Sequence, residues 1–292
     1  MKPRVDITNR LWGSGLQRQR EALAEANAEV STVTVRGMRL RVARTPGSGT
    51  PLLLCNGIGA NLELALTFAR ALRQPCILFD MPGNGGSPAS WFCPVAAQYA
   101  RFAAGVLDAL GVSEPVAVAG VSWGGLVAQR FALDHPARVS HLVLMATTPG
   151  IIMFPGRPSA LLRMITPQRY LSRTFMARNA GTLYGGAMRQ HPEYAMEFAG
   201  LTRAPTAGAY FQQIFAAWSF TSLHWLRRIR CPALVIVGDD DPIVRPINGW
   251  LLAKLLPSAR LVKIPQGGHL FMTTHAKAVG AMVSDFINGA SR

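Results

Sequence analysis

Short runs of consecutive apolar residues, separated by segments of helical periodicity, constrain the fold of this chain more than any other feature. The runs occupy residues 51–55, 76–79, 116–119, 141–145, 232–237 and 260–264. Continuous apolar sequence of this length is typical of strands that are covered on both faces, as in parallel sheets. Helical patterns over 62–72, 95–110 and 126–135 lie between the first four runs. This alternation predicts an α/β fold with a mostly parallel, doubly wound sheet.

Three further segments complete the expected organisation. Residues 32–42 alternate apolar or β-branched residues with polar ones around Arg36-Gly37, which predicts a hairpin that joins the sheet antiparallel. From Gly150 onward the sequence becomes helical, proline-broken and rich in Met and aromatic residues. We therefore expect domain boundaries that place a polar N-terminal arm before an α/β core and insert a helical cap into that core: arm 1–30, core 31–149 and 226–292, cap 150–225.

The charge distribution bears on the partners of the chain. The formal net charge is +15, and residues 151–230 contain ten arginines, no lysine and two glutamates. No helix-turn-helix, zinc-finger or RNA-binding signature accompanies this charge, so nucleic acid is not an expected partner. The pattern favours an anionic, partly apolar interface, or else a cap that simply packs on the core.

The cysteine content and the chain ends bear on location. The four cysteines form no CxxC or CxxH pair, which is typical of reduced thiols in a cytoplasmic protein. The N-terminal sequence lacks the apolar segment of a secretory signal, and no stretch of eighteen uncharged apolar residues occurs. The expected location is cytoplasmic, without a transmembrane segment.

The pattern Gly120-Val121-Ser122-Trp123-Gly124 follows one of the apolar runs and precedes helix-forming sequence. A G-x-S-x-G pattern in this context predicts a sharp strand-to-helix turn that exposes the serine hydroxyl, with glycines where backbone packs too closely for side chains. We expect Ser122 to be a nucleophile. A glycine-rich phosphate loop is the alternative, but no G-K-[ST] follows, which excludes a P-loop.

A serine nucleophile needs a base, and histidine titrates in a suitable range. The turn around Ser122 resembles the nucleophile turn of the α/β hydrolases, and this resemblance implies the order nucleophile, acid, histidine along the chain. His269 follows the last apolar run and two glycines, which makes it the expected base, and Asp241 is the expected orienting carboxylate. Asp239 and Asp240 remain alternatives, because the triple aspartate would also suit a solvated acidic turn or a cation site.

Negative charge on the carbonyl oxygen of an ester must be met by fixed backbone N–H groups. We expect one from Trp123, which follows the nucleophile, and one from Ile58, in the turn after the first parallel strand. Asn56 and Gly57 in the same turn are expected to contact substrate. This mechanism requires no metal and no organic cofactor, so none is expected.

At these residues the sequence resembles the intracellular medium-chain-length poly(3-hydroxyalkanoate) depolymerases of the α/β-hydrolase superfamily, over about residues 32–288. The motifs that carry the resemblance lie at 55–64, 122–125, 184–186, 221–226, 238–242 with 247–248, and 267–271. The resemblance implies hydrolysis of ester bonds in a storage polyester at the surface of cytoplasmic granules. It also implies a catalytic triad of Ser122, Asp241 and His269.

Two other functions remain in competition. One is an esterase, thioesterase or acyltransferase that acts on small acyl substrates with the same triad. The other is a granule-binding protein with an inactive hydrolase fold. Haloalkane dehalogenase and epoxide hydrolase chemistry both require a carboxylate nucleophile at the strand-to-helix turn, and Ser122 at that position argues against them.

Overall fold

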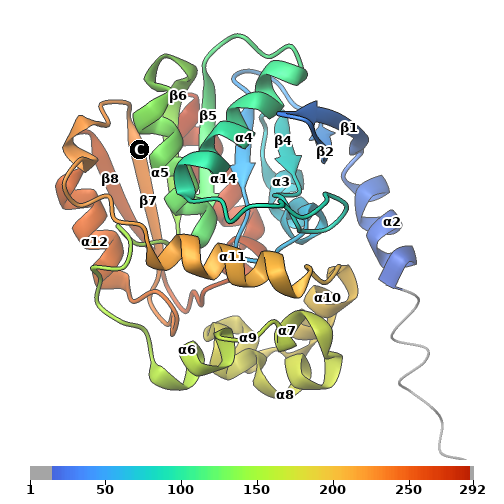
Figure 1. The fold of residues 1–292 in the computed structure, drawn as a ribbon. Coiled ribbons are helices and arrows are strands. Elements are labelled where there is room, and N and C mark those ends of the chain that lie inside the picture. The colour runs from blue at the N-terminus through green and yellow to red at the C-terminus, as the bar shows by residue number, and fades with distance from the viewer. Residues whose placement is uncertain (1–14, 290–292) are drawn as a thin grey trace, which may run out of the picture.

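An eight-stranded sheet runs through the middle of the molecule, in the order β1-β2-β4-β3-β5-β6-β7-β8 (Figure 1). The computed structural model describes residues 15–289. The strands are β1 (Glu29–Val35), β2 (Met38–Thr45), β3 (Leu52–Cys55), β4 (Cys76–Phe79), β5 (Val116–Val121), β6 (Val139–Met145), β7 (Ala233–Gly238) and β8 (Ala259–Ile264). β2 pairs antiparallel with β1 and β4, and every other neighbouring pair is parallel. The expected α/β-hydrolase architecture with a mostly parallel sheet is confirmed.

The hairpin β1–β2 closes through Arg36 and Gly37, whose φ angles are 52° and 80°. Two consecutive residues with positive φ form the kind of two-residue turn that matches the twist of a β-hairpin. Glycine takes this conformation readily, whereas Arg36 does so at a cost. β1 begins at Glu29, so the strand starts slightly before the alternation that predicted it.

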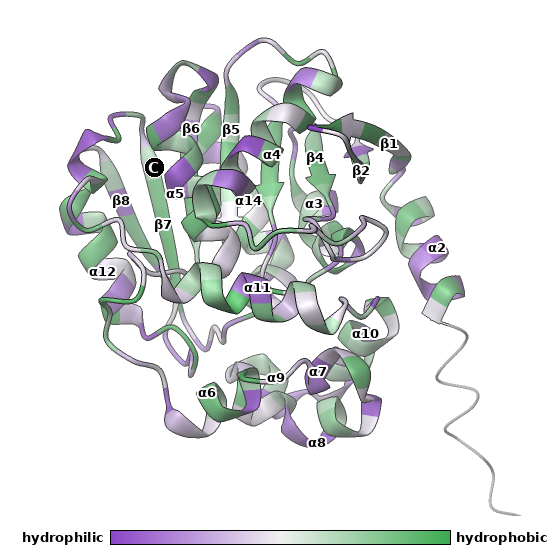
Figure 2. Ribbon diagram, in the orientation of Figure 1, coloured by the Kyte–Doolittle hydropathy of each residue, from purple (hydrophilic) through white to green (hydrophobic). Residues whose placement is uncertain are grey.

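Helices cover both faces of the sheet, and each face has its own buried cluster. One face is covered by α4 (Ala96–Ala109), α5 (Trp123–Asp134) and α12 (Pro246–Leu255), the other by α3 (Leu66–Ala71) and α14 (Ala276–Ile287). Along β3, Leu53 faces the first cluster, whereas Leu52 and Leu54 face the second. Figure 2 shows the central strands in the colours of hydrophobic residues. Burial on both faces explains why the sequences of these strands are continuous apolar runs.

The chain leaves the sheet after β6 and forms a helical layer before it returns as β7. This layer contains α6 (Pro158–Met164), α7 (Gln168–Leu171), α8 (Arg173–Tyr184), α9 (Ala187–Gln190), α10 (Pro192–Leu201) and α11 (Ala207–Trp218). It lies below the sheet in Figure 1, with α11 crossing in front. A third buried cluster joins it to the core, because Ala60 and Leu64 of the core pack among its apolar side chains. We refer to residues 150–225 as the cap.

The helix α2 (Gly15–Glu25) packs beside α10 at the edge of the molecule (Figure 1). Its buried Gln19 donates hydrogen bonds of 3.3 Å to the carbonyl oxygens of Leu201 and Thr202. This glutamine anchors a segment that the sequence presented as a polar arm. Residues 1–14 of that expected arm lie outside the described residues. Over 15–289, no helix has the length and hydropathy needed to cross a bilayer.

Candidate active site

Ser122 occupies the tight turn between β5 and α5. Its backbone has φ 54° and ψ −120°, a conformation that is strained for a residue with a Cβ and costs on the order of 1–3 kcal/mol. Neighbouring backbone holds the turn: Ser122 N–H donates to Met145 O at 2.9 Å, and Thr147 Oγ1 donates to Ser122 O at 2.7 Å. Strain at a single residue, held by its surroundings, is typical of a functional position.

The glycines around Ser122 are required by close backbone contacts. A Cβ on Gly124 would lie 1.9 Å from the carbonyl oxygen of Cys55, and one on Gly120 would lie 2.3 Å from that of Gly124. Both distances are far below van der Waals contact, and backbone atoms cannot swing aside as a flexible side chain would. The glycine pattern in the sequence is therefore a direct consequence of the packing of the elbow.

His269 and Asp241 form a buried pair, with 2.8 Å between Nδ1 and Oδ2 and side chains only 5% and 1% exposed. The other carboxylate oxygen of Asp241 accepts hydrogen bonds from the backbone N–H groups of Ile243 at 2.8 Å and Val244 at 2.9 Å. The carboxylate is thus fixed by three donors. When Nδ1 donates to Asp241, Nε2 of His269 carries the lone pair that a general base needs.

The two alternative aspartates have other positions. Asp240 Oδ2 accepts from the backbone N–H of Gly186 at 2.7 Å and pairs with Arg189 Nη1 at 3.1 Å, so this carboxylate holds the cap. Asp239 is exposed. Within the described residues, neither forms a hydrogen bond or an ion pair with His269, and no cluster of three potential metal ligands occurs.

Ser122 and His269 line one small cavity beneath the cap, with a volume of about 40 Å³. In the part of the chain that the structure describes, no hydrogen bond joins the Ser122 hydroxyl to His269. In enzymes without substrate such bonds are often long and shorten when substrate binds. The structure therefore brings the expected nucleophile and base to one site without showing the bond between them.

The turn that carries Ile58 is held from the cap. Ile58 O accepts hydrogen bonds from Tyr170 Oη at 2.5 Å and from Arg169 Nη2 at 3.2 Å. No residue within 15–289 accepts a hydrogen bond from the backbone N–H of Ile58. Trp123 is the first residue of α5, a position whose N–H has no partner within the helix. Both backbone donors are therefore available to an oxyanion.

Asn56 and Gly57 line the same cavity, but the amide of Asn56 is used within its own loop. Its Nδ2 donates to Asn61 O at 3.0 Å, and its Oδ1 accepts from Gly57 N–H at 2.9 Å. From α11, Gln213 Oε1 accepts a hydrogen bond from the backbone N–H of Gly59, the residue after Ile58, at 2.9 Å. The side chain of Asn56 thus shapes the turn, and a contact with substrate remains a prediction for both residues.

The cap also contacts the histidine loop, which the sequence did not reveal. His269 N–H donates to Tyr184 O at 2.7 Å. A Cβ on Gly186 would lie 2.2 Å from Gly268 N, and one on Gly268 would lie 2.1 Å from Tyr184 O. Paired glycines at 185–186 and 267–268 were the only signal of this contact in the sequence, because two backbones approach without side chains between them.

Comparison with known proteins agrees with this geometry. A family model described as the alpha/beta hydrolase fold matches residues 50–276. A poly(3-hydroxyalkanoate) depolymerase of Ectopseudomonas oleovorans is 44% identical over 260 residues, which cover 88% of this chain and 91% of that protein. The chain belongs to the poly(3-hydroxyalkanoate) depolymerase family of α/β hydrolases.

More distant relatives of this α/β hydrolase include other esterases. A pimeloyl-[acyl-carrier protein] methyl ester esterase of Chromobacterium violaceum is 29% identical over 79% of this chain and 91% of that protein. Two solved structures share the fold. An esterase from Thermogutta terrifontis has a TM-score of 0.76 and 24% identity, and the match covers 91% of this chain and 100% of that chain. An enol-lactonase from Burkholderia xenovorans has a TM-score of 0.76 and 22% identity, and the match covers 88% of this chain and 100% of that chain. These two structures agree in fold, and the 44% identity to a poly(3-hydroxyalkanoate) depolymerase makes ester hydrolysis the reaction class of this chain.

Proposed function

We propose that this chain hydrolyses ester bonds of a medium-chain-length poly(3-hydroxyalkanoate), with Ser122 as nucleophile, His269 as general base and Asp241 as the carboxylate that orients the histidine. The observation that carries the proposal is the buried 2.8 Å contact between His269 and Asp241, at a cavity that Ser122 also lines. The identity of 44% to a poly(3-hydroxyalkanoate) depolymerase supports the choice of polymer.

The proposed reaction has two steps. His269 takes the proton of the Ser122 hydroxyl as it attacks the ester carbonyl, then gives that proton to the leaving alkoxide, and an acyl-enzyme remains. Water, deprotonated by the same histidine, then releases the acid. The N–H groups of Ile58 and Trp123 stabilise the oxyanion in both steps, and loss of one such donor typically costs about 3–4 kcal/mol of barrier.

The walls of the cavity suit an alkyl side chain. Apolar side chains from core and cap surround Ser122, among them Leu64, Met164, Phe198 and Met272. A volume of about 40 Å³ holds little more than water, so a medium-length 3-hydroxyacyl unit requires the cap or these side chains to move. Met and Leu adapt readily to substrates of irregular shape.

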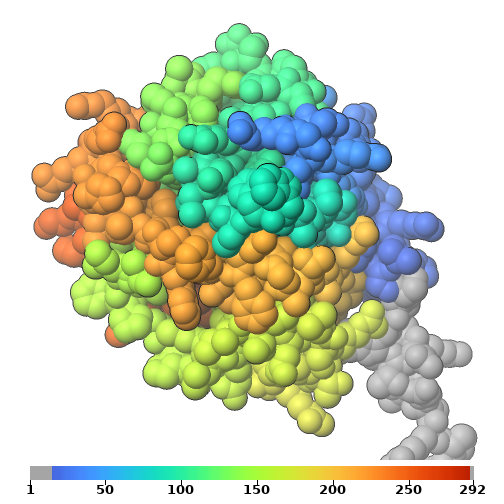
Figure 3. All heavy atoms as spheres, in the orientation of Figure 1, coloured from blue at the N-terminus to red at the C-terminus, as the bar shows by residue number. Residues whose placement is uncertain are grey.

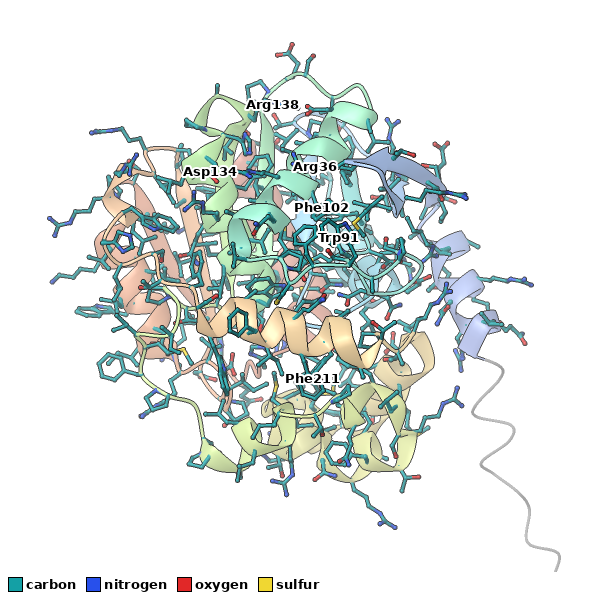
Figure 4. The ribbon with its side chains drawn as sticks, in the orientation of Figure 1. Arg36, Trp91, Phe102, Asp134, Arg138 and Phe211 are labelled. Atoms are coloured by element: carbon teal, nitrogen blue, oxygen red, sulfur yellow. The ribbon has the colours of Figure 1, made fainter. Side chains whose placement is uncertain are left out.

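An apolar face beside the site supports docking on a polymer granule. Phe211, Phe215 and Trp218 are exposed along one side of α11, and Trp91, 91% exposed, lies in the loop before α4. Gln212 Nε2 donates to Ser90 O at 3.4 Å, which joins that loop to α11. Trp91 and Phe211 are labelled in Figure 4, and the same face is turned to the viewer in Figure 3. Arginines of the cap would contact anionic groups at the granule surface.

A second candidate is hydrolysis of small acyl esters, favoured by the small volume of the cavity and by the pimeloyl ester esterase among the relatives. Product analysis separates the two. Purified protein is incubated with medium-chain polyester granules, with short-chain granules, and with a soluble medium-chain ester. Release of 3-hydroxy acids from medium-chain granules supports the proposal. Turnover of the soluble ester alone would favour the second candidate.

A further inference from the structure

Arg169, in the four-residue helix α7 of the cap, is a buried cation at the proposed catalytic cavity. The residue is only 4% exposed and lines the same cavity as Ser122 and His269. Its Nη2 donates to Ile58 O at 3.2 Å, and its Nη1 lies 2.5 Å from Met164 Sδ. Its Nε is buried and has no hydrogen-bond partner. Hydrogen bonding to Arg169 also involves the phenols of Tyr170 and Tyr184, so the N–H on Nε is the guanidinium donor that has no partner among the described residues.

The charge of Arg169 also has no anionic partner. No Asp or Glu of the described chain lies within 4.0 Å of its guanidinium. Instead the guanidinium carbon lies 4.7 Å from the ring centroid of Tyr170 and 5.6 Å from that of Tyr210. Burial raises the pKa of Tyr170 and of Tyr184, so these phenols stay neutral and do not balance the charge. An uncompensated buried cation is costly unless an anion joins it.

We infer that Arg169 binds the free carboxylate at the end of a polyester chain, and thereby places the last ester bond of that chain at Ser122. This inference rests on the proposed function and specifies which part of the polymer the site recognises. A guanidinium suits a carboxylate because its planar donors match the two oxygens.

The position of Arg169 fits the spacing within the polymer. In a chain of 3-hydroxy acids, two carbon atoms separate the last ester oxygen from the terminal carboxyl carbon. Arg169 donates a hydrogen bond to the carbonyl oxygen of Ile58, and the N–H of the same Ile58 is proposed to hold the oxyanion. The guanidinium of Arg169 is therefore expected to lie close to the reacting ester. Attack by Ser122 breaks the bond between the acyl carbon and that oxygen. The alkoxide takes a proton from His269 and leaves as a 3-hydroxy acid anion held by Arg169.

Two soluble substrates test the inference: a dimer of a medium-chain 3-hydroxy acid with a free carboxyl end, and the methyl ester of the same dimer. The readout is the ratio of kcat/KM values for cleavage of the internal ester. We expect the wild-type enzyme to prefer the free acid, and Arg169→Met to reduce the ratio about ten- to a hundredfold, the range for a hydrogen-bonded charge. Arg169→Lys keeps the charge and should retain part of the preference.

Tyr170→Phe is the matched control, because it removes the other hydrogen bond to Ile58 O without removing a charge. This variant should slow both dimers alike and leave the ratio unchanged. An unchanged ratio in Arg169→Met, or an equal loss on both dimers, would overturn the inference and leave the proposed function standing. If the wild-type enzyme releases 3-hydroxy acids from granules but cleaves neither dimer, the inference falls and the proposed function stands; if it acts on neither the granules nor the dimers, the proposed function falls as well.

Inhibition of the wild-type enzyme gives a test that does not depend on folding of a variant. Octanoate carries the proposed anion, and 1-octanol has the same chain length without charge. In the methyl-ester assay, octanoate should compete with substrate at a concentration at least about tenfold lower than 1-octanol. Equal inhibition by the two compounds would contradict recognition of a carboxylate.

Discussion

The backbone N–H of His269 donates a 2.7 Å hydrogen bond to the carbonyl oxygen of Tyr184, so the cap holds the histidine loop directly. The cap therefore does more than cover the cavity. It fixes the backbone of the proposed base through Tyr184, and it fixes the proposed oxyanion turn through Tyr170 and Arg169. Changes in the cap should consequently alter the chemistry as well as substrate binding.

Gly186→Ala should damage both stability and rate. Gly186 has φ 48°, and an added Cβ would lie 2.2 Å from Gly268 N, so the cap and the histidine loop must separate. We expect a loss of about 1–3 kcal/mol in the free energy of unfolding and a lower kcat. The control is Gly208→Ala in α11, where a Cβ meets nothing within 4 Å and alanine should be neutral or stabilising by up to about 1 kcal/mol. Equal stability of the two variants would contradict the close approach of Gly186 in the cap to Gly268 in the histidine loop.

The aspartates at 240 and 241 should differ sharply when each is changed to asparagine. Asp241→Asn removes the carboxylate that orients His269 and should lower kcat by about 10⁴-fold. Asp240→Asn weakens the contacts to Gly186 and Arg189, so it should cost about 1 kcal/mol of stability and much less activity. Steady-state kinetics and denaturant unfolding of both variants test these roles. A larger loss of kcat in Asp240→Asn than in Asp241→Asn would mean that Asp240, not Asp241, orients His269.

Asp80 should make stability depend on pH. Burial raises its pKa from 3.8 to about 6, against the opposing effects of the Gly86 N–H and of Arg41. Because the folded state holds the proton more tightly, the stabilisation from this proton is full below the unfolded pKa and is lost as pH rises through about 6. The wild type should therefore lose about 3 kcal/mol relative to Asp80→Asn between roughly pH 3 and pH 7. If the free energies of unfolding of the two proteins change with pH in the same way, the raised pKa of the buried Asp80 carboxyl is contradicted.

The apolar face of α11 should be needed for polymer granules and dispensable for soluble esters. The double substitution Phe215→Ser and Trp218→Ser removes two exposed aromatic residues. Each can contribute about 1.5–3 kcal/mol to the free energy of binding when it is buried against the granule. Co-sedimentation with granules should weaken at least about tenfold, with kcat on a soluble ester unchanged. Trp250→Ser on α12, also exposed, is the matched control and should bind as the wild type does. Equal loss of binding in both would indicate nonspecific adhesion.

The fold and the elbow were readable from the sequence because both depend on local requirements. Strands buried on both faces need continuous apolar residues, and a strained serine turn needs glycine at Gly120 and Gly124. The assignment to a family followed from the same segments and is supported by the comparisons.

Contacts between distant segments could not be read in this way. The arginines of the cap were visible only as charge, and nothing local marks Arg169 as the one buried beside Ile58. The sequence presents Gln213 as an ordinary polar residue on an apolar helix, and its hydrogen bond to the backbone N–H of Gly59 is visible only in the structure. Asn56 was expected to contact substrate, yet its amide is committed to its own loop, because a sharp turn must satisfy its backbone first.

The most direct test of the account is the reactivity of Ser122. An organophosphonate should label the wild-type protein at Ser122 and abolish release of 3-hydroxy acids from polyester granules. Ser122→Ala should fold with the same thermal transition, take up no label and lower hydrolysis by about 10⁴-fold or more. Ser159→Ala, on the exposed surface of the cap, should behave as the wild type does. A folded Ser122→Ala protein that keeps full activity on granules would contradict the mechanism.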